Sequence, residues 1–477
     1  MIYFINKKDN KLNKDILNED TIAAIATPPG HGGIAIIRIS GKNSLSILKN
    51  IFMRSNNKSI DEIKPYRFYR GFVINNKDKQ AVDDVLVVYM KSPNSYTGQD
   101  IVEIHSHGGN VVPKVVLDLC LINGARAANP GEYTLRAFLN GKMDLSQAEA
   151  VVDVINSQTE KALKQSQLQL EGQLSKKINT YKDILLDMLA EIEANVDFPE
   201  EGIDPIVKDR ILGESESLII NLKELISTFN DGHILKHGMT TAIIGRPNVG
   251  KSSLLNCLLR KERALVSEIP GTTRDFIEET IDINGIPLKL TDTAGIRATE
   301  KSIEKMGIDI SIKKSQEAEF LIIVLDSSQN LNKDDYEVIK LIRNSNHIII
   351  FNKNDLSMKI SADDLPSNIN KDNVLDISAK NNTNIEELRT KIFNIISGDH
   401  KANESTSVII SELRHKNSLE QALQSFERFK KALNINESPE YLAVDLRYGL
   451  DKFGEITGEI TTEDILSTIF SKFCIGK

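Results

Sequence analysis

Short runs in which hydrophobic and polar residues alternate dominate the first third of the chain, and they predict β-strands. The strand-like runs are Ile22–Ala26, Ile34–Ile39, Val85–Met90 and Ile101–His105. After them, Val111–Leu121 has the three- and four-residue hydrophobic spacing of an amphipathic helix. We therefore predict an α/β domain over residues 21–141, preceded by a polar, loosely ordered extension at residues 1–20.

The hydrophobic period then changes to three and four residues, which is typical of long amphipathic helices. Leu145–Glu193 and Ile211–Phe229 follow this period, and it returns from Ser411 to the end of the chain. We predict one all-α domain in two parts, residues 142–237 and 399–477, on either side of an insertion.

Strand-like and helical runs alternate over residues 238–398, which predicts that the insertion is an α/β domain. The apolar strand-like runs are Met239–Ile244, Leu321–Leu325, His347–Phe351 and Val374–Ile377. The helical runs are Ser253–Leu259, Ser302–Lys314, Asp335–Arg343 and Ile385–Ile396. Asn284-Gly285 joins Ile277–Ile283 to Ile286–Leu290, and Asn-Gly is a strong hairpin signal. One antiparallel hairpin in an otherwise parallel sheet predicts a Ras-like P-loop GTPase fold.

Composition and charge narrow the class of protein. With 477 residues the chain is too long for a single core, and 40% hydrophobic with 26% charged residues is ordinary for a globular protein. The net charge of −8 argues against unaided binding of nucleic acid, so an RNA substrate would need a local basic patch or a second protein. Cys120, Cys257 and Cys474 are too scattered for a disulfide framework or a zinc site. No apolar run approaches the roughly 20 residues that cross a bilayer, so we expect a cytoplasmic protein without membrane attachment.

A glycine-rich loop, Gly245-Arg-Pro-Asn-Val-Gly-Lys-Ser252, separates a predicted strand from a predicted helix. It fits G-x-x-x-x-G-K-[ST], whose backbone N–H groups surround nucleotide phosphates while the helix directs its positive dipole end at them. Lys251 would supply a positive charge, and Ser252 would ligate Mg²⁺. The predicted phosphate-binding residues are Asn248, Val249, Gly250, Lys251, Ser252 and Ser253.

A second motif, Asn352-Lys-Asn-Asp355, predicts which base is bound. The Asp355 carboxylate can accept from both N1–H and the 2-amino group of guanine, a donor pair that adenine lacks, so an ATPase is disfavoured. Ser378-Ala-Lys380 follows a predicted strand and fits the loop behind the guanine ring. Each motif alone also occurs in ordinary turns, but their order and strand contexts favour a GTP site. The predicted guanine-binding residues are Asn352, Lys353, Asp355, Ser378, Ala379 and Lys380.

Two segments between these motifs have the composition of switches that sense the γ-phosphate. They are Ile269-Pro-Gly-Thr-Thr-Arg-Asp275 and Asp292-Thr-Ala-Gly295, which includes Thr293 and Ala294. Thr273 would complete Mg²⁺ coordination when the γ-phosphate is present, and Asp292 would reach the ion through water. The Gly295 N–H would meet the γ-phosphate.

Ile296 stands where Ras-like enzymes carry the glutamine that orients the attacking water. An isoleucine side chain forms no hydrogen bond, so hydrolysis needs an acid, a cation or a partner. Asn248 and the backbone carbonyls of Ser267–Thr272 would together hold a monovalent cation against the phosphates. Glu304 is placed to orient water, although a surface glutamate is more often simply a solvated carboxylate.

With these motifs, the chain from about residue 20 to its end resembles the tRNA modification GTPase family called MnmE, also TrmE. The most specific shared motifs lie outside the nucleotide domain. They are Thr27-Pro-Pro-Gly-His-Gly-Gly-Ile-Ala-Ile-Ile-Arg-Ile-Ser-Gly41, Tyr96-Thr-Gly-Gln-Asp100, His107-Gly-Gly109, Pro130-Gly-Glu-Tyr133, Arg136-Ala-Phe-Leu-Asn-Gly-Lys142, Asn195-Val-Asp-Phe-Pro-Glu200, Gly454-Glu-Ile-Thr-Gly458 and Phe473-Cys-Ile-Gly-Lys477.

This resemblance implies that the N-terminal domain binds a one-carbon tetrahydrofolate, in its 5-formyl or 5,10-methylene form, at a homodimer interface. It places the folate contacts at Arg38, Glu103, Lys142 and Lys477. It also implies activation of the GTPase domain by potassium. The implied metal ligands are Asn248, Ser267, Ile269 and Thr272 for potassium and Ser252 and Thr273 for magnesium, with Glu304 as the hydrolytic carboxylate. For Cys474, the family's terminal cysteine, catalysis and a small apolar packing role are both open.

The resemblance further implies a reaction on tRNA, in which an aminomethyl or carboxymethylaminomethyl group is installed at C5 of a wobble uridine. The implied partner is an MnmG-like FAD protein in a heterotetramer, and this chain carries no dinucleotide fingerprint of its own. The alternative is a ribosome-assembly or RNA-chaperone GTPase without modifying activity. That class usually carries a basic RNA-binding module, whereas residues 21–142 are not notably basic. Which tRNAs are modified, and whether glycine or ammonium supplies the nitrogen, stay open.

Overall fold

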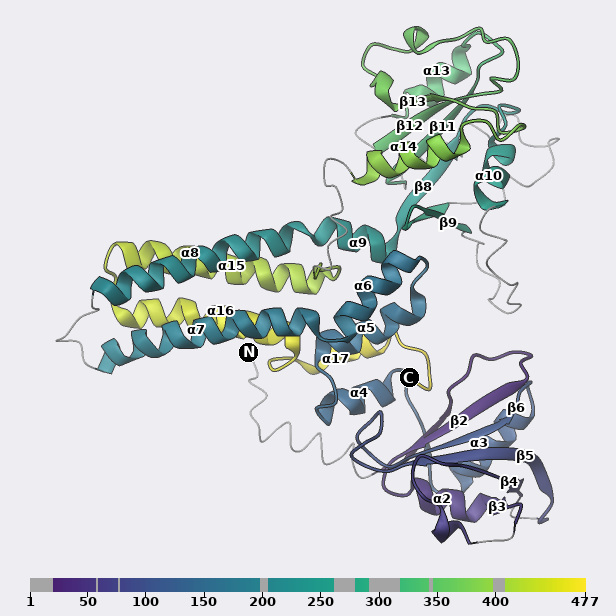
Figure 1. Cartoon of the computed structure of the whole chain (residues 1–477), viewed down its shortest axis with the longest axis vertical. Helices are drawn as coiled ribbons and strands as arrows, with labels where there is room; N and C mark the ends of the chain where they lie inside the picture. Colours follow the sequence, from purple (N-terminus) through teal and green to yellow (C-terminus); the bar gives the residue numbers. More distant parts are fainter. Residues whose placement is uncertain are drawn as a thin grey trace. The chain divides into compact units, whose positions relative to one another are not determined.

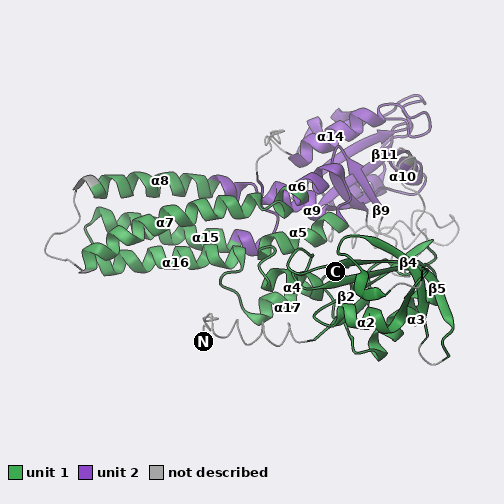
Figure 2. Ribbon diagram, turned by 60° about the horizontal axis from the view of Figure 1, so that its bottom comes forward, with its two compact units in different colours: residues 1–155, 167–223, 417–477 green, residues 156–166, 224–416 purple. Residues whose placement is uncertain are grey.

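The computed structural model describes residues 20–56, 59–75, 78–197, 205–260, 279–290, 318–342, 346–397 and 408–477. The chain divides into two compact units, coloured separately in Figure 2. Unit 1 contains Met1–Ile155, Gln167–Lys223 and Asn417–Lys477, and unit 2 contains Asn156–Ser166 and Glu224–Lys416. The predicted domain boundaries, at residues 20, 141, 237 and 398, stay a prediction.

Unit 1 begins with a seven-stranded sheet in the order β3-β4-β5-β6-β2-β1-β7. Its strands are β1 (Ile22–Ile25), β2 (Ile34–Ser40), β3 (Phe52–Arg54), β4 (Phe68–Ile74), β5 (Ala81–Met90), β6 (Ile101–His107) and β7 (Arg126–Ala127). The accompanying helices are α2 (Ser44–Ile51), α3 (Val112–Ile122), α4 (Glu132–Leu139) and the short 3-10 helix η1 (Ile60–Glu62). Neighbouring strands are antiparallel except for the parallel pair β1 and β7.

The period-two pattern of the strands gives this sheet one apolar face and one mixed face. Helices α2 and α3 pack on the apolar face, where Ile47, Val116 and Ile37 are fully buried in one core. Arg38 and Glu103 point to the opposite face, because each lies between inward-pointing neighbours on its strand. The sheet therefore separates a hydrophobic core from a face that carries charged side chains.

The helical part of unit 1 combines segments from before and after the inserted unit. The helices are α5 (Leu145–Asn156), α7 (Gln173–Asp197), α8 (Pro205–Ser227), α15 (Leu413–Asn434), α16 (Pro439–Thr457) and α17 (Glu463–Phe470). Most of α6 (Glu160–Leu170), the end of α8 and the start of α15 are assigned to unit 2. In Figure 1, α7 lies along α16 and α8 along α15. The Tyr181 ring on α7 lies 6.0 Å from the Phe453 ring on α16, and Lys223 on α8 pairs with Glu427 on α15. The prediction of one helical domain interrupted by an insertion is confirmed by this shared packing.

Unit 2 is built on a six-stranded sheet in the order β13-β12-β11-β8-β10-β9. Its strands are β8 (Met239–Ile244), β9 (Glu279–Ile283), β10 (Ile286–Leu290), β11 (Phe320–Asp326), β12 (Asn346–Asn352) and β13 (Val374–Asp376). Its helices are α9 (Phe229–His237), α10 (Lys251–Arg260), α13 (Lys333–Ile339) and α14 (Ile385–Ser397), with 3-10 turns η2 (Ala362–Asp364) and η3 (Lys371–Asn373). Only β9 and β10 pair antiparallel among these strands, which confirms the predicted hairpin in a parallel sheet.

Helices cover both faces of this second sheet. Leu254 of α10 and Leu388 of α14 are buried in the core on one face, whereas Val338 of α13 belongs to the core on the other. In the sheet, β8 lies between β10 and β11, so the strand order reverses direction at β8. The carboxyl ends of the strands near such a reversal are where ligands bind in open α/β sheets.

The structure also differs from the predicted elements at several points. The predicted helical stretch Leu145–Glu193 forms three helices, α5, α6 and α7, with Gly172 at a left-handed φ of 78° in the second break. Helix α13 ends at Ile339 instead of the predicted Arg343. The predicted helix Ser302–Lys314 lies outside the described residues.

Candidate functional site

The phosphate loop Gly245–Ser252 connects β8 to α10 and is shaped by two close backbone approaches. A Cβ at Gly245 would lie 2.4 Å from the carbonyl oxygen of Val324, and a Cβ at Gly250 would lie 2.2 Å from Nδ2 of Asn352. Only glycine fits either position without displacement of its neighbour. The loop therefore lies tightly against β11 and β12 and leads into the N-terminus of α10, whose first backbone N–H groups have no partner within the helix.

Lys251 lies over its own loop. Its Nζ donates to the carbonyl oxygens of Gly245, at 2.7 Å, and Arg246, at 2.8 Å. The predicted ligands Asn248, Ser252 and Ser253 are exposed, whereas Val249 is buried. An ammonium group and an exposed hydroxyl at a helix N-terminus form a site suited to a magnesium-bound phosphate.

Asn352 joins the three predicted nucleotide motifs. Its Nδ2 donates to the Val249 carbonyl at 2.7 Å, and its Oδ1 accepts from the Ala379 backbone N–H at 3.0 Å. The Ser378 hydroxyl donates to Oδ1 of Asp355 at 2.6 Å. Asn352 is only 3% exposed, while Asp355 is exposed and its carboxylate can meet a ligand. The phosphate loop, the Asn352–Asp355 motif and the Ser378–Lys380 loop thus form one site.

The two lysines of the guanine motifs, Lys353 and Lys380, have different surroundings. Lys353 has a left-handed φ of 71°, and its Nζ forms an ion pair of 2.7 Å with buried Asp326. Lys380 is exposed at the edge of the site. Several predicted nucleotide and cation residues lie outside the described part of the chain. They are Ser267, Ile269, Thr272, Thr273, Asp292, Thr293, Ala294, Gly295 and Glu304.

A second candidate site lies on the mixed face of the unit 1 sheet. Arg38 of β2 and Glu103 of β6 are directly opposite in the antiparallel register, and Nε of Arg38 donates to Oε1 of Glu103 at 2.9 Å. Tyr96 and Tyr133 lie around the same guanidinium, with ring centroids 5.9 Å and 5.6 Å from its Cζ. Tyr133 is fully buried beneath Arg38, whereas Tyr96 is partly exposed. A cation, a carboxylate and the Tyr96 ring can together bind a planar heterocycle that carries N–H donors and carboxylates.

The C-terminal segment reaches this second site. A Cβ at Gly476 would lie 2.6 Å from the Ile25 carbonyl oxygen, and the Gly476 carbonyl accepts from Nη1 of Arg38 at 3.1 Å. Burial, together with the nearby Arg38 charge, lowers the pKa of Lys477. Cys474 is exposed. Residues 38 and 477, at opposite ends of the sequence, are therefore brought together.

Lys142 joins this site only through the loop that follows β5. Its Nζ donates to the Pro93 carbonyl at 3.1 Å, and a Cβ at Gly98 would lie 3.5 Å from its stem. Tyr96, from the same loop, lies against Arg38. Among the described residues, Lys142 forms no hydrogen bond or ion pair with Arg38, Glu103 or Lys477.

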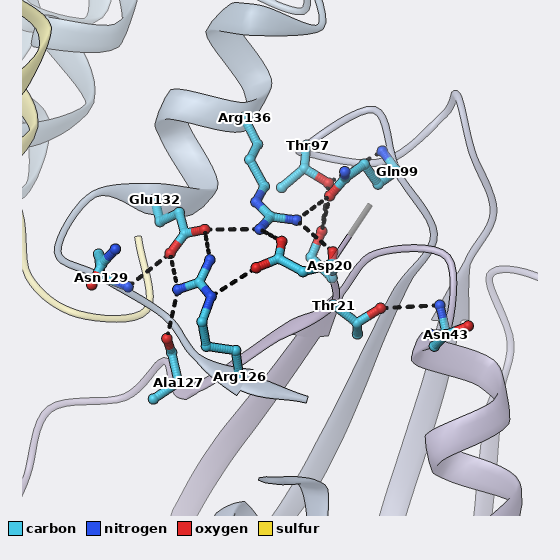
Figure 3. Close-up of polar contacts among 11 residues, drawn as sticks. Asp20, Thr21, Asn43, Thr97, Gln99, Arg126, Ala127, Asn129, Glu132 and Arg136 are labelled. Carbon is cyan, nitrogen blue, oxygen red and sulfur yellow. Dashed lines mark hydrogen bonds and ion pairs between the residues drawn. The ribbon is translucent and has the colours of Figure 1, made fainter. Parts of the chain in front are cut away.

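Helix α4 supports this site through a partly buried ion network, drawn in Figure 3. Arg136, 1% exposed, donates to Glu132, Asp20 and Gln99, and Arg126 binds the same two carboxylates. From the same helix, the Tyr133 hydroxyl donates to the Arg38 carbonyl at 2.7 Å, and the Thr134 and Tyr96 hydroxyls lie 2.8 Å apart. The network thereby fixes the helix that positions Arg38 and Tyr96.

Tyr96, Tyr133 and Arg136 lie in motifs of the sequence, but those motifs predict no role for them. The signal for Tyr96 and Tyr133 was their aromatic character close to predicted site residues. Asp326 was missed entirely, although a polar residue directly after a buried parallel strand lies at the ligand-binding edge of such a sheet.

Comparison with known proteins identifies the family. A model of the MnmE helical domain matches residues 145–474, and a model of the GTP-binding protein TrmE N-terminus matches residues 21–142. The tRNA modification GTPase MnmE of Alkaliphilus oremlandii is 43% identical over 460 residues, covering 96% of this chain and 99% of that protein. The chain belongs to the tRNA modification GTPase MnmE family. As a member of the MnmE family it is a GTP hydrolase.

A second curated relative gives the same assignment. The MnmE of Thermoanaerobacter pseudethanolicus is 44% identical over 96% of this chain and 99% of its own length. Among solved structures, the FeoB G domain of Methanococcus jannaschii matches 34% of this chain and 98% of its own length, at 24% identity and a TM-score of 0.25. Within the residues that the structure describes, every helix is too short or too polar to cross a membrane.

Proposed function

We propose that this chain is a potassium-dependent GTPase that modifies tRNA together with a flavoprotein. In this proposal, a one-carbon tetrahydrofolate, in the 5-formyl or 5,10-methylene form, supplies carbon for an aminomethyl or carboxymethylaminomethyl group at C5 of the wobble uridine. The observation that carries the proposal is the bridge made by Asn352, which holds the phosphate loop and the Ser378–Lys380 loop beside Asp355. Membership of the MnmE family over nearly the whole chain supports the same reaction.

The nucleotide chemistry follows from the residues of unit 2. Asp355 would accept from the two guanine donors, and the N-terminus of α10 with Lys251 would bind the phosphates. Magnesium would be held by Ser252 together with Thr273, and potassium by the Asn248 side chain with Ser267, Ile269 and Thr272. Bound potassium would supply the positive charge that an arginine finger gives in other GTPases, and Glu304 would orient the water.

The folate proposal rests on the donor set of the second site. Glu103 would accept from pterin N–H groups, and Arg38 with Lys477 would meet carboxylates or carbonyls of the ligand. Lys142 is the fourth proposed contact, near the loop that carries Tyr96. The side chains of Arg38 and Glu103 are only 17% and 15% exposed. Their hydrogen bonds to a ligand would therefore be largely shielded from water, which strengthens them.

The proposed assembly has two levels. Two copies of this chain would form a homodimer with folate at the interface, and an MnmG-like FAD protein would complete a heterotetramer. The tRNA would bind to the assembly, since this chain is acidic overall and would gain affinity for phosphates from its partner.

Potassium dependence is tested by GTP turnover in potassium and in sodium chloride at equal ionic strength. We expect turnover on the order of a hundred-fold faster in potassium, the effect of one well-placed charge on a developing anion. Asn248→Gly should lose this stimulation yet keep GDP affinity, because glycine adopts the φ of 64° without strain. Equal rates in the two salts would remove the cation from the proposal.

Folate binding separates the proposal from a ribosome-assembly or RNA-chaperone GTPase. The full chain is titrated with 5-formyltetrahydrofolate, and Arg38→Gln should weaken binding about ten- to a hundred-fold. Arg70→Gln is the matched control, because Arg70 pairs with Asp84 on an exposed part of the same sheet. A wild-type chain that binds GTP but no folate would favour the chaperone class.

A further inference from the structure

Asp326, the last residue of β11, is a buried carboxylate beside the guanine motif. It is 4% exposed and accepts from Nζ of Lys353 at 2.7 Å and from the backbone N–H and hydroxyl of Ser328 at 3.0 and 2.7 Å. Burial raises the pKa of Asp326, but the hydrogen bonds from Lys353 and Ser328 outweigh that effect and hold it below its ordinary value. The carboxylate is therefore ionised and paired at neutral pH.

The turn that follows Asp326 is bonded to the guanine motif by the backbone as well. In the parallel register Asp326 lies beside Asn352, and both the backbone N–H and the hydroxyl of Ser327 donate to the Asn352 carbonyl, at 2.9 and 2.8 Å. The Ser327 carbonyl in turn accepts from the Lys359 N–H at 2.7 Å. This turn thus contacts the motif at Asn352, just before Lys353, and the chain beyond the motif at Lys359.

Lys353 adopts a backbone conformation that needs outside support. Its φ of 71° lies in the left-handed region, which disfavours residues with a Cβ. Such conformations persist where surrounding contacts over-determine them, often at ligand sites. Its ion pair with Asp326 is one such contact, and the flanking Asn352 and Asp355 depend on the same stretch of backbone for their directions.

The same turn continues to the phosphate loop. Oε1 of Gln329 accepts from Nη2 of Arg246 at 3.0 Å, and Nε of Arg246 lies 3.2 Å from the buried carboxylate of Asp335 on α13. Gln329 is also within 3.4 Å of Asp326 through its Nε2. A continuous set of polar contacts therefore joins the second residue of the phosphate loop to Lys353.

We propose that Asp326 is a positioning residue for guanine-nucleotide binding, which acts by holding Lys353 and hence the directions of Asn352 and Asp355. This inference rests on the proposed guanine site. Asp326 does not touch the nucleotide in this account. It fixes the geometry in which the bridging amide and the base-selecting carboxylate are presented, so its loss lowers affinity for GDP and GTP alike and leaves turnover at saturating GTP unchanged.

The test is a double-mutant cycle on the full chain, read as the dissociation constant of a fluorescent GDP analogue. Asp326→Asn should weaken GDP binding about ten- to a hundred-fold, as expected for loss of a charged hydrogen bond. Lys353→Met leaves a buried carboxylate unpaired and should weaken binding at least as much. The double variant should bind no more weakly than Lys353→Met alone, because both residues act through one interaction.

Matched measurements keep fold and function apart. Asp363→Asn breaks the exposed Lys371–Asp363 pair in the same unit and should leave GDP affinity within two-fold of wild type. Ser328→Ala removes one hydrogen bond to Asp326 without changing the charge of Asp326, so a smaller loss of GDP affinity, about two- to five-fold, is expected. This variant tests the inference if the Asp326→Asn chain does not fold. The maximal rate at saturating GTP should stay near the wild-type value in both Asp326→Asn and Ser328→Ala.

The outcomes separate the inference from the function on which it rests. Wild-type affinity in both Asp326→Asn and Ser328→Ala, or effects of Asp326→Asn and Lys353→Met that multiply in the double variant, would overturn the positioning role alone. A wild-type chain that does not bind GDP would overturn the proposed guanine site and this inference with it.

Discussion

The Asp355 carboxylate is exposed, and its Oδ1 accepts from the buried Ser378 hydroxyl at 2.6 Å. One carboxylate aimed by a buried neighbour is enough to choose between purines, because guanine and adenine differ in the donors that they present on this edge. Discrimination by a hydrogen bond is steep, since the wrong ligand leaves a desolvated polar group unpaired.

We predict that Asp355→Asn changes base selectivity. GDP affinity should fall about a hundred-fold, because a charged acceptor for two donors is lost. Xanthosine diphosphate should bind better than GDP, since the asparagine amide can donate to the C2 carbonyl of xanthine. Competition binding against a fluorescent GDP analogue measures both, with Asp372→Asn as an exposed control. Unchanged preference for GDP would show that Asp355 does not contact the base.

Lys477 offers a pH-dependent prediction. Its pKa is lowered by burial and by Arg38, so its charged form is disfavoured in the folded chain. That cost to stability is present at neutral pH and disappears as pH rises through the folded pKa toward 10.5. An anionic folate would favour the charged form, so its binding should take up protons at alkaline pH and weaken as pH rises above the lowered pKa.

Calorimetric titration in buffers of different ionisation enthalpy measures this proton uptake. Lys477→Gln should abolish it, whereas Lys472→Gln, at an exposed position nearby, should leave it unchanged. Proton uptake that survives Lys477→Gln would assign it to another group.

Individual site residues were predictable only where a motif named them. Asn352, Ser378 and Ala379 were predicted from their motifs, and the structure brings them together. Asp326 lies in no motif, because its role depends on which strands are neighbours in the sheet. Periodicity along one strand does not carry that information.

At the scale of elements, α4 shows how a short helix is held by charge. Glu132 is 3% exposed and binds both Arg126 and Arg136. Burial raises the pKa of Glu132, but the hydrogen bonds from Arg126, the Asn129 backbone and Arg136 outweigh it, so the pKa lies below the ordinary value. The stability that this carboxylate contributes is present above the unfolded pKa near 4.5 and is lost as pH falls through the folded pKa.

Glu132→Gln should destabilise unit 1 by about 3–5 kcal/mol, because it removes the only buried counter-charge among the two carboxylates that pair with the buried Arg136, the other being the partly exposed Asp20. Chemical denaturation at neutral pH measures the change, and the difference from wild type should shrink as pH is lowered through the folded pKa of Glu132. The control is Asp84→Asn, which breaks an exposed pair and should have little effect. Equal stability of the Glu132→Gln and Asp84→Asn chains would contradict the buried-network account.

Elements with clear periodicity were predicted, and those with mixed signals were missed. The hairpin around Asn284-Gly285 and the parallel strands of unit 2 match the sequence pattern. Strand β4 was missed because Gly71 interrupts it. A Cβ at Gly71 would lie 2.2 Å from the Met53 carbonyl oxygen, so tertiary packing demands the residue that weakens the local strand signal.

At the scale of the whole molecule, helices from before and after the insertion share one core. Tyr181 and Phe453 pack together although more than half of the chain separates them, and the nucleotide-binding sheet is formed by the segment between. The insertion was predictable, because the helical period stops and resumes. The packing partner of each helix was not predictable, because the apolar face of an amphipathic helix does not show which other helix it packs against.

The central claim is that this GTPase acts in wobble-uridine modification of tRNA. It is tested most directly by nucleoside mass spectrometry of tRNA from cells that lack the chain. The C5-substituted wobble uridine should disappear, return with the wild-type chain, and stay absent with Asp355→Asn. Normal levels of the modified uridine in cells without the chain would contradict the account.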